Sequence, residues 1–299
     1  MKRVISLSLG SSKRDKTVTA EFFGETFEIS RQGVDGDEKK FVERLAELDG
    51  MVDAIGYGGM DRYLWSEGKR YEFAVSRKLL AGAKKTPVLD GSGLKNTLER
   101  AAVQWLQSNG VVDFAHKKTL IVSAVDRFGM SEALIACGGQ ICFGDLMFGL
   151  DLPIGITNPK IFKVVARTLL PIVVHLPLSI LYPTGEKQNH IVPKWGKWYE
   201  WADVIAGDFL YIRRHMPQDL KGKTILTNTT TEENQKELKE RGVAQLITTT
   251  PVFEGRSFGT NVMEAMLVAI NGGKEMQPEE YLAMLQKLDW KPNVISLTG

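Results

Sequence analysis

The chain contains few of the residues that build disulfide scaffolds and metal sites. Its 299 residues include two cysteines, Cys137 and Cys142, and both lie in apolar surroundings. Without a second pair, these cysteines support neither a disulfide framework nor a zinc site. We interpret them as small buried hydrophobic residues. The four histidines show no metal-ligand spacing, so we expect no metal site.

A surplus of charge of one sign is also absent. The formal net charge is +2, and lysines and arginines are interspersed with acidic residues along the whole chain. Nucleic-acid binding needs a sustained basic face, so we expect no nucleic-acid partner. The proportions of hydrophobic and charged residues, 43% and 25%, are those of an ordinary globular protein, and the length allows two domains with their own cores.

Long apolar runs without charges are missing as well. The N-terminal stretch MKRVISLSLGSSKRDK turns polar after Leu9, which favours a first strand over a signal peptide and predicts a cytoplasmic protein. The most apolar segment, Ile161–Leu181, contains two basic residues, a histidine and two prolines that interrupt its helical pattern. We therefore expect no membrane span. This segment is predicted to be a buried helical pair, or an apolar lid over a site or a subunit interface of a possible homo-oligomer.

Strand-like and helix-like segments alternate along the chain, which indicates an α/β fold with a mostly parallel sheet. The alternation restarts at KTLIVSAVD, after a seam at Val111–Lys118. There a strand, a helix and a second strand follow within about thirty residues, as a βαβ unit requires. We predict a smaller α/β substrate-binding domain at residues 1–114. A Rossmann-like parallel-sheet domain that binds a dinucleotide is predicted at residues 115–299, with an apolar helical insertion at about residues 152–198.

The turn between the first strand and helix of this unit lacks the usual glycines. Set against the Gly-x-x-Gly-x-x-Gly pattern of dinucleotide-binding turns, it has serine, aspartate and one glycine. Serine is small and aspartate tolerates left-handed backbone, while the helix N-terminus offers N–H groups to a phosphate. The alternative is a strand that simply continues into a helix. The predicted cofactor-binding residues of the turn are Ser123, Asp126, Arg127, Phe128 and Gly129.

Polar residues at later strand ends extend the predicted cofactor site. Asp145 follows the second strand, about twenty residues beyond the turn, where an acid binds ribose hydroxyls. A carboxylate there favours NAD, although Arg127 could pair with the 2′-phosphate of NADP. Asn228, Thr229 and Thr249 supply neutral hydrogen-bonding groups for a nicotinamide amide or a sugar-like substrate. Asp145 could also be an ordinary solvated acid in a turn.

The sequence Asp90-Gly-Ser-Gly-Leu-Lys95-Asn96 places polar groups between a strand and a helix of the first domain. Because hydride transfer from an alcohol needs a group that accepts the hydroxyl proton, Lys95 and Asp90 are the predicted catalytic pair. Capping of the helix by Asp90 or Ser92 is the alternative role. The stretch GYGGMDRY could bring Asp61 or Tyr63 to the same cleft.

Six stretches are similar to bacterial Rossmann-fold proteins classed as quinate or shikimate 5-dehydrogenases. They are SLGSSKRDK, TPVLDGSGLKNTLER, VSAVDRFGM, WADVIAGDFLYIRRHMP, TNTTTEE and TTTPVFEGRSFGTNVMEA. The resemblance implies a substrate domain followed by a nicotinamide-binding domain, with oxidation of a ring hydroxyl or reduction of a ring ketone.

The predicted function is therefore that of an NAD(P)-dependent oxidoreductase acting on a quinate- or shikimate-like small molecule. Two alternatives remain open. One is a reductase of an acyl or lipid-like substrate, suggested by the apolar segment. The other is a non-catalytic Rossmann-like ligand-binding protein, suggested by the missing glycines. The chain has no Gly-x-Ser-x-Gly elbow and no Walker loop, which argues against a serine hydrolase or a P-loop enzyme.

Overall fold

The computed structural model describes residues 1–177, 191–250, 252–253, 256–257 and 259–298. The described strands are β1 (Lys2–Ser8), β2 (Lys16–Phe22), β3 (Glu25–Gly33), β4 (Ala54–Gly58), β5 (Tyr63–Ser66), β6 (Lys69–Glu72), β7 (Val88–Leu89), β8 (Lys118–Ile121), β9 (Gln140–Phe143), β10 (Val204–Ala206), β11 (Thr224–Thr227), β12 (Gln245–Thr248), β13 (Val252–Phe253), β14 (Arg256–Ser257) and β15 (Asn293–Ser296). The described α-helices are α1 (Glu38–Leu48), α2 (Ala74–Leu80), α3 (Ser92–Ser108), α4 (Phe128–Cys137), α5 (Asp145–Leu150), α6 (Pro159–Val173), α8 (Gly196–Trp201), α9 (Phe209–His215), α10 (Glu232–Glu240), α11 (Thr260–Ile270) and α12 (Pro278–Lys287). Single 3₁₀ turns occur at Ser12–Arg14 and Phe114–His116.

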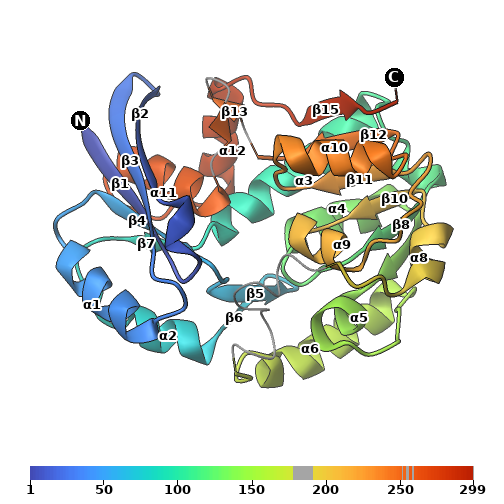
Figure 1. The fold of residues 1–299 in the computed structure, drawn as a ribbon, viewed down its shortest axis with the longest axis horizontal. Helices are drawn as coiled ribbons and strands as arrows, with labels where there is room; N and C mark the ends of the chain where they lie inside the picture. The colour runs from blue at the N-terminus through green and yellow to red at the C-terminus, as the bar shows by residue number, and fades with distance from the viewer. Residues whose placement is uncertain (178–190, 251, 254–255, 258, 299) are drawn as a thin grey trace.

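Two separate sheets give the molecule a two-domain α/β fold (Figure 1). The first sheet has the strand order β2-β3-β1-β4-β7, with β1 parallel to both of its neighbours and β2 antiparallel to β3. The second has the order β15-β12-β11-β10-β8-β9, parallel except for the edge strand β15. The predicted α/β class with mostly parallel sheets is confirmed at this level.

Strands of the second sheet are short apolar runs because helices cover both of its faces. Leu120, Ile121 and Val122 are fully buried, although successive side chains point to opposite faces. Such continuous burial is typical of parallel strands in α/β proteins. The strand ends, where side chains leave this core, are consequently the positions at which polar groups gather.

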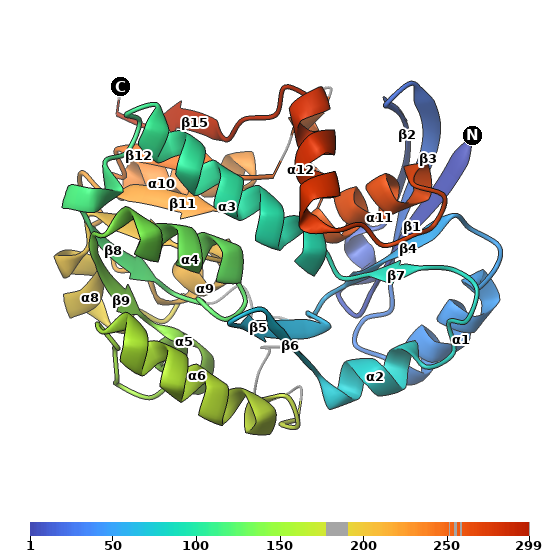
Figure 2. The same cartoon turned by 180° about the vertical axis from the view of Figure 1, so that it is seen from behind.

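The C-terminal helices cross back to the first sheet. Helix α11 packs against β1, β4 and β7, and α12 packs against α3, before the chain returns to form β15 in the second sheet (Figures 1 and 2). The sequence prediction placed all of residues 115–299 in one domain. Residues 262–269 are buried without interruption, so α11 is covered on all sides. The alternation of strands and helices along a sequence does not reveal which of two sheets a helix packs against.

A hairpin that the sequence analysis missed connects the two sheets. Strands β5 and β6 pair antiparallel around Glu67 and Gly68, which both have positive φ (49° and 75°), as a type I′ turn requires. The run YEFAVSRKLLAGAKK resembles one helix in sequence, but its first two residues belong to β6, and α2 begins at Ala74. The Trp65 N–H donates to the Val125 carbonyl at 3.0 Å, which ties the hairpin to the turn after β8.

The stability of the first domain should depend on pH through Glu264 of α11. This side chain is 2% exposed and accepts a hydrogen bond from the Tyr281 hydroxyl at 2.7 Å. Burial, with a contribution from Asp90, raises the pKa of Glu264 to about 8. The folded protein therefore holds a proton that the unfolded chain releases at lower pH, so stability is present at acid pH and lost as pH rises through about 8.

Glu264→Gln should remove this loss, because the amide keeps an acceptor for Tyr281 and carries no charge. We expect it to raise the free energy of unfolding by about 2–4 kcal/mol at about pH 8.5 and to change it little at about pH 5. Urea unfolding at the two pH values measures the difference. An equal effect at both would show that ionisation of Glu264 does not set the pH dependence.

Candidate functional site

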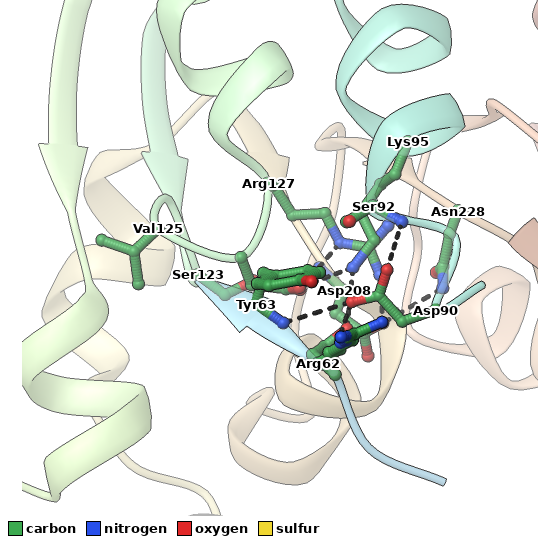
Figure 3. A network of polar contacts seen from close by, with 12 residues as sticks. Arg62, Tyr63, Asp90, Ser92, Lys95, Ser123, Val125, Arg127, Asp208 and Asn228 are labelled. Atoms are coloured by element: carbon green, nitrogen blue, oxygen red, sulfur yellow. Dashed lines mark hydrogen bonds and ion pairs between the residues drawn. The ribbon is translucent and has the colours of Figure 1, made fainter. Parts of the chain in front are cut away.

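Side chains that follow strands of both sheets meet in one polar network (Figure 3). Asp61 follows β4 and Asp90 follows β7 of the first sheet, whereas Asp126 and Arg127 follow β8 and Asp208 follows β10 of the second. Strands β8 and β10 are neighbours at the point where the chain changes its direction of travel across the sheet. Open α/β sheets bind ligands at the carboxyl ends of strands at such a point.

Lys95 of α3 is the link between the domains. Its Nζ lies 2.9 Å from Asp61 Oδ1 and 2.6 Å from Asp126 Oδ1. Burial disfavours its charge, but Asp126 and Asp61 together raise the pKa of Lys95 above its usual range. Burial likewise opposes ionisation of Asp126, yet Lys95 and Arg127 hold the pKa of Asp126 below its usual value. Burial, followed by the Asp126 charge, raises the pKa of Asp61 to about 6.

The predicted pairing of Lys95 with Asp90 is corrected to a pairing with Asp61. Both oxygens of Asp90 are taken by backbone N–H groups. Oδ2 accepts from Arg62 at 2.8 Å and from Tyr63 at 3.2 Å, and Oδ1 accepts from Ser92 at 3.0 Å. Asp90 therefore joins the first residue of α3 to the start of β5, and the N-cap of α3 is Gly91 rather than Asp90 or Ser92.

Arg127, a predicted cofactor residue, is buried among three carboxylates. It donates to Glu99 of α3 and to Asp208 Oδ2 at 2.5 Å, and its Nε lies 3.0 Å from Asp126. Burial raises the pKa of Glu99, against the attraction of Arg127. Arg127 thus joins α3, the turn after β8 and the end of β10, and its guanidinium is occupied by groups of this chain.

Gly129 lies where two helices come into close contact. A Cβ atom there would lie 2.0 Å from the backbone oxygen of Asn96. The glycine therefore allows α3 and α4 to approach closely at the start of α4. Phe128 is buried beside it, and Ser123 Oγ accepts the Asp208 N–H at 3.4 Å. In this structure these residues hold elements together, and their predicted contacts with a cofactor stay predictions.

The Asp145 side chain forms a hydrogen bond with the backbone of the turn after β8. Asp145 is the first residue of α5, and its Oδ1 accepts the Val125 N–H at 2.9 Å. Burial raises the pKa of Asp145 to about 6, although backbone N–H groups of Val125 and Ala124 oppose the rise. Its carboxylate thus contacts backbone N–H groups of the turn that was predicted to bind a dinucleotide. The predicted contact of Asp145 with a ribose, and NAD as the cofactor, stay untested.

The remaining residues that were predicted to bind a cofactor lie at the ends of β11 and β12. Asn228 Nδ2 donates to Asp208 Oδ2 at 3.0 Å, so Asn228 belongs to the polar network. Thr229 follows it at a half-buried position. Thr249 is fully buried, its N–H donates to the Thr227 carbonyl at 2.9 Å, and its Oγ1 has no hydrogen-bond partner among the described residues.

An apolar cavity of about 100 Å³ adjoins the network. Helix α6 forms one wall, and the hairpin residue Leu64, helix α5 and the turn after β8 complete it. The wall from α6 consists of Phe162, Val165, Ala166, Leu169, Leu170 and Val173. The polar end consists of Asp61, Ser123, Asp126, Asp145 and Tyr211.

Helix α6 forms most of the apolar segment that was predicted to cover a site. Its apolar inner face does line the cavity, as one of the two predicted arrangements required. Pro171 lies within the last turn of this helix, so the prediction that it interrupts the helix is wrong. Residues 178–181 of the segment lie outside the described residues. None of the helices in the described part of the chain is long and apolar enough to span a membrane. The described residues also contain no cluster of His, Cys, Asp and Glu suited to a metal ion.

Glu99, Asp208 and Tyr211 are site residues that sequence reasoning missed. A signal for Glu99 was present, because Lys95, Glu99, Ala102 and Leu106 recur at helical spacing on one face of α3. Two opposite charges on an otherwise apolar helix face indicate buried, paired groups. The sequence around Asp208 and Tyr211 shows no comparable pattern of paired charges.

The geometry defines a two-domain α/β protein with a polar network and an apolar cavity between its domains. The chain belongs to the family described as a domain of unknown function (DUF8754), whose model matches residues 93–297. Residues 3–90 match a second domain of unknown function (DUF8753). The gap between these matches lies at the turn between β7 and α3, ahead of the predicted boundary at residue 114. No curated protein matches the sequence.

Several solved structures are distantly similar over most of their length. A sugar ABC transport substrate-binding protein from Bordetella parapertussis is 11% identical, with a TM-score of 0.39 over 100% of this chain and 90% of that chain. A periplasmic ribose ABC transporter protein from Conexibacter woesei is 10% identical, with a TM-score of 0.37 over 95% and 94%. Glutamate dehydrogenase from Thermus thermophilus is 12% identical, with a TM-score of 0.44 over 96% and 72%.

The predicted resemblance to quinate and shikimate dehydrogenases is wrong. The family models that match the chain describe domains of unknown function and not quinate or shikimate dehydrogenases. The oxidoreductase function drawn from that resemblance is therefore withdrawn. In the turn that suggested it, Asp126 and Arg127 are engaged by Lys95 and Glu99.

Proposed function

We propose that the protein binds a small organic molecule, without catalysis, in the cavity between α6 and the polar network. The observation that carries this proposal is the cavity itself, which is apolar along α6 and polar at the carboxyl ends of β4 and β8. Ligand sites of this kind combine an apolar lining with a few convergent polar groups. The order β9-β8-β10-β11-β12 is the flavodoxin-like doubly wound order, and it supports a ligand site at the switch point between β8 and β10.

A binding role also agrees with the observation that the basic side chains of the polar network are fully engaged in ion pairs. Lys95, the best candidate for a general base, donates to two carboxylates and has a raised pKa. A protonated, fully engaged lysine is poorly suited to accept a proton from a substrate. Arg127 is similarly engaged. These groups fix the relation between the domains and leave the cavity as the place for a ligand.

Titration with butan-1-ol, followed through the methyl resonances of Val165 and Leu170, tests the proposal. We expect saturable shifts of these resonances in the wild type. Val165→Phe should abolish the shifts of the Leu170 methyl resonances, which this variant keeps, because the added ring fills the cavity that Val165 lines. Val164→Phe is the matched control, since the neighbouring Val164 is 54% exposed on α6. Absence of saturable shifts in the wild type, or equal effects of the two variants, would contradict binding in this cavity.

A further inference from the structure

Carboxyl groups outnumber cationic groups in the polar network that adjoins the cavity. The cations of the network, Lys95 and Arg127, contact four carboxylates, those of Asp61, Glu99, Asp126 and Asp208. Two cations neutralise at most two of these carboxylates, and Asp145 adds a further acidic group to the polar end of the cavity. Burial of unbalanced like charges is unfavourable, so the site favours an incoming cation over a neutral or anionic group.

Asp145 also presents an unused acceptor. Its Oδ1 is bound by the Val125 N–H. Its Oδ2 is buried and has no hydrogen-bond partner within the described part of the chain. A buried carboxylate oxygen without a donor is costly, and the walls from α6 and Leu64 offer none. The residue lines the cavity, so a ligand that carries N–H groups would supply the missing donor.

The apolar lining of the cavity indicates what the non-polar part of such a ligand is. Apart from Asp145, its lining from α5 and α6 is apolar, and its volume of about 100 Å³ accommodates a short chain better than a ring system with polar substituents. A polyhydroxylated molecule would leave its hydroxyl groups without partners against this wall, which is unfavourable. The acidic end and the apolar wall together describe an amphiphilic ligand.

We infer that the ligand is a small organic cation, an ammonium group on a short apolar body. Its N–H donors would reach the acceptors at Asp145 and Asp61, while its hydrocarbon part contacts the α6 wall. An ammonium group has three donors and no acceptor, which matches an end of the cavity rich in acceptors. This inference rests on the proposed function, because it specifies the ligand class of the same cavity.

A series of probes of similar size separates charge from shape. n-Butylamine, butan-1-ol and butyrate each contain four carbon atoms and differ in the charge of the head group. At about pH 7.5 Asp145 is ionised, because its pKa is about 6. We expect n-butylamine to bind the wild type at least about tenfold more tightly than butan-1-ol, and butyrate more weakly than either. The methyl resonances of Val165 and Leu170 report all three titrations.

Asp145→Asn tests the partner directly. The amide oxygen can still accept the Val125 N–H, so the turn is kept while the charge is removed. We expect the affinity for n-butylamine to fall about tenfold and that for butan-1-ol to stay unchanged. Asp151→Asn is the matched control, since Asp151 ends the same helix, is exposed and pairs with Lys194 outside the cavity. Asp61→Asn removes a second carboxylate charge from the cavity while keeping an acceptor for Lys95. Its effect on the affinity for n-butylamine is a second test of whether charge matters.

The possible failures are distinguishable. If butan-1-ol and n-butylamine bind the wild type with equal affinity, the cavity is a ligand site but the assignment of a cation is overturned. The same conclusion follows if neither Asp145→Asn nor Asp61→Asn changes the preference for the amine. If no probe shifts the lining methyl groups, the proposed function itself fails.

Discussion

Arg127→Met is expected to destabilise the protein by about 3–5 kcal/mol, or to prevent folding. Arg127 is buried and lies against Glu99, Asp126 and Asp208. Its removal would leave these carboxylates with Lys95 as their one nearby cation among the described residues. Burying unpaired charge is among the largest sources of mutational destabilisation. Urea unfolding monitored by tryptophan fluorescence measures the change.

Two comparisons make the Arg127 result specific. Arg44→Met removes an exposed ion pair with Glu47, and we expect it to change stability by at most about 1 kcal/mol. Adding Glu99→Leu to Arg127→Met should recover part of the loss, because the most buried of the orphaned carboxylates is then absent. An Arg127→Met protein as stable as Arg44→Met would show that the network does not hold the domains together.

Gly129→Ala is expected to produce the second large effect. The added Cβ would lie 2.0 Å from the Asn96 oxygen, a backbone atom of α3 that cannot move without shifting the helix. Overpacking typically costs about 1–3 kcal/mol, and this contact with rigid backbone should lie at or above the upper end. Because Asn96 adjoins Lys95, separation of α3 from α4 should also disturb the ion pairs of the network.

Gly149→Ala is the matched control for the helix-packing effect. Gly149 also lies in a helix, α5, and a Cβ there meets no atom within 4 Å. Alanine at such a position should stabilise the protein by up to about 1 kcal/mol, because glycine has the lower helix propensity. Thermal unfolding should therefore shift in opposite directions for the two glycines. A fall of the same size for both would show that α3 and α4 have room to separate.

Much of the secondary structure was predictable because apolar residues recur at strand or helix spacing. The βαβ unit from β8 to β9 has the predicted order, and α3 ends at Ser108, just before Gly110. The packing of α11 on the first sheet was not predictable, since a helix buried on all sides carries no directional pattern. The hairpin β5–β6 was missed because its Glu-Gly turn lies beside a helix-like run of residues.

The site was predictable in its location but not in its contacts. Lys95 and the turn after β8 were both identified, yet their partners depend on how α3 lies against α4. The single glycine of the turn was interpreted as part of a phosphate-binding pattern, whereas it permits the contact with Asn96. The acid that was expected to bind a ribose accepts the Val125 N–H, a contact that the sequence did not predict. Such distinctions depend on distances between segments that are far apart in the sequence.

The most direct test of the account is a crystal structure of the protein grown in the presence of n-butylamine. We predict density for one amine in the cavity, with its carbon chain against Val165 and Leu170 and its nitrogen within hydrogen-bonding distance of Asp145 Oδ2. An empty cavity at saturating amine would contradict the account, as would an amine whose nitrogen points away from Asp145.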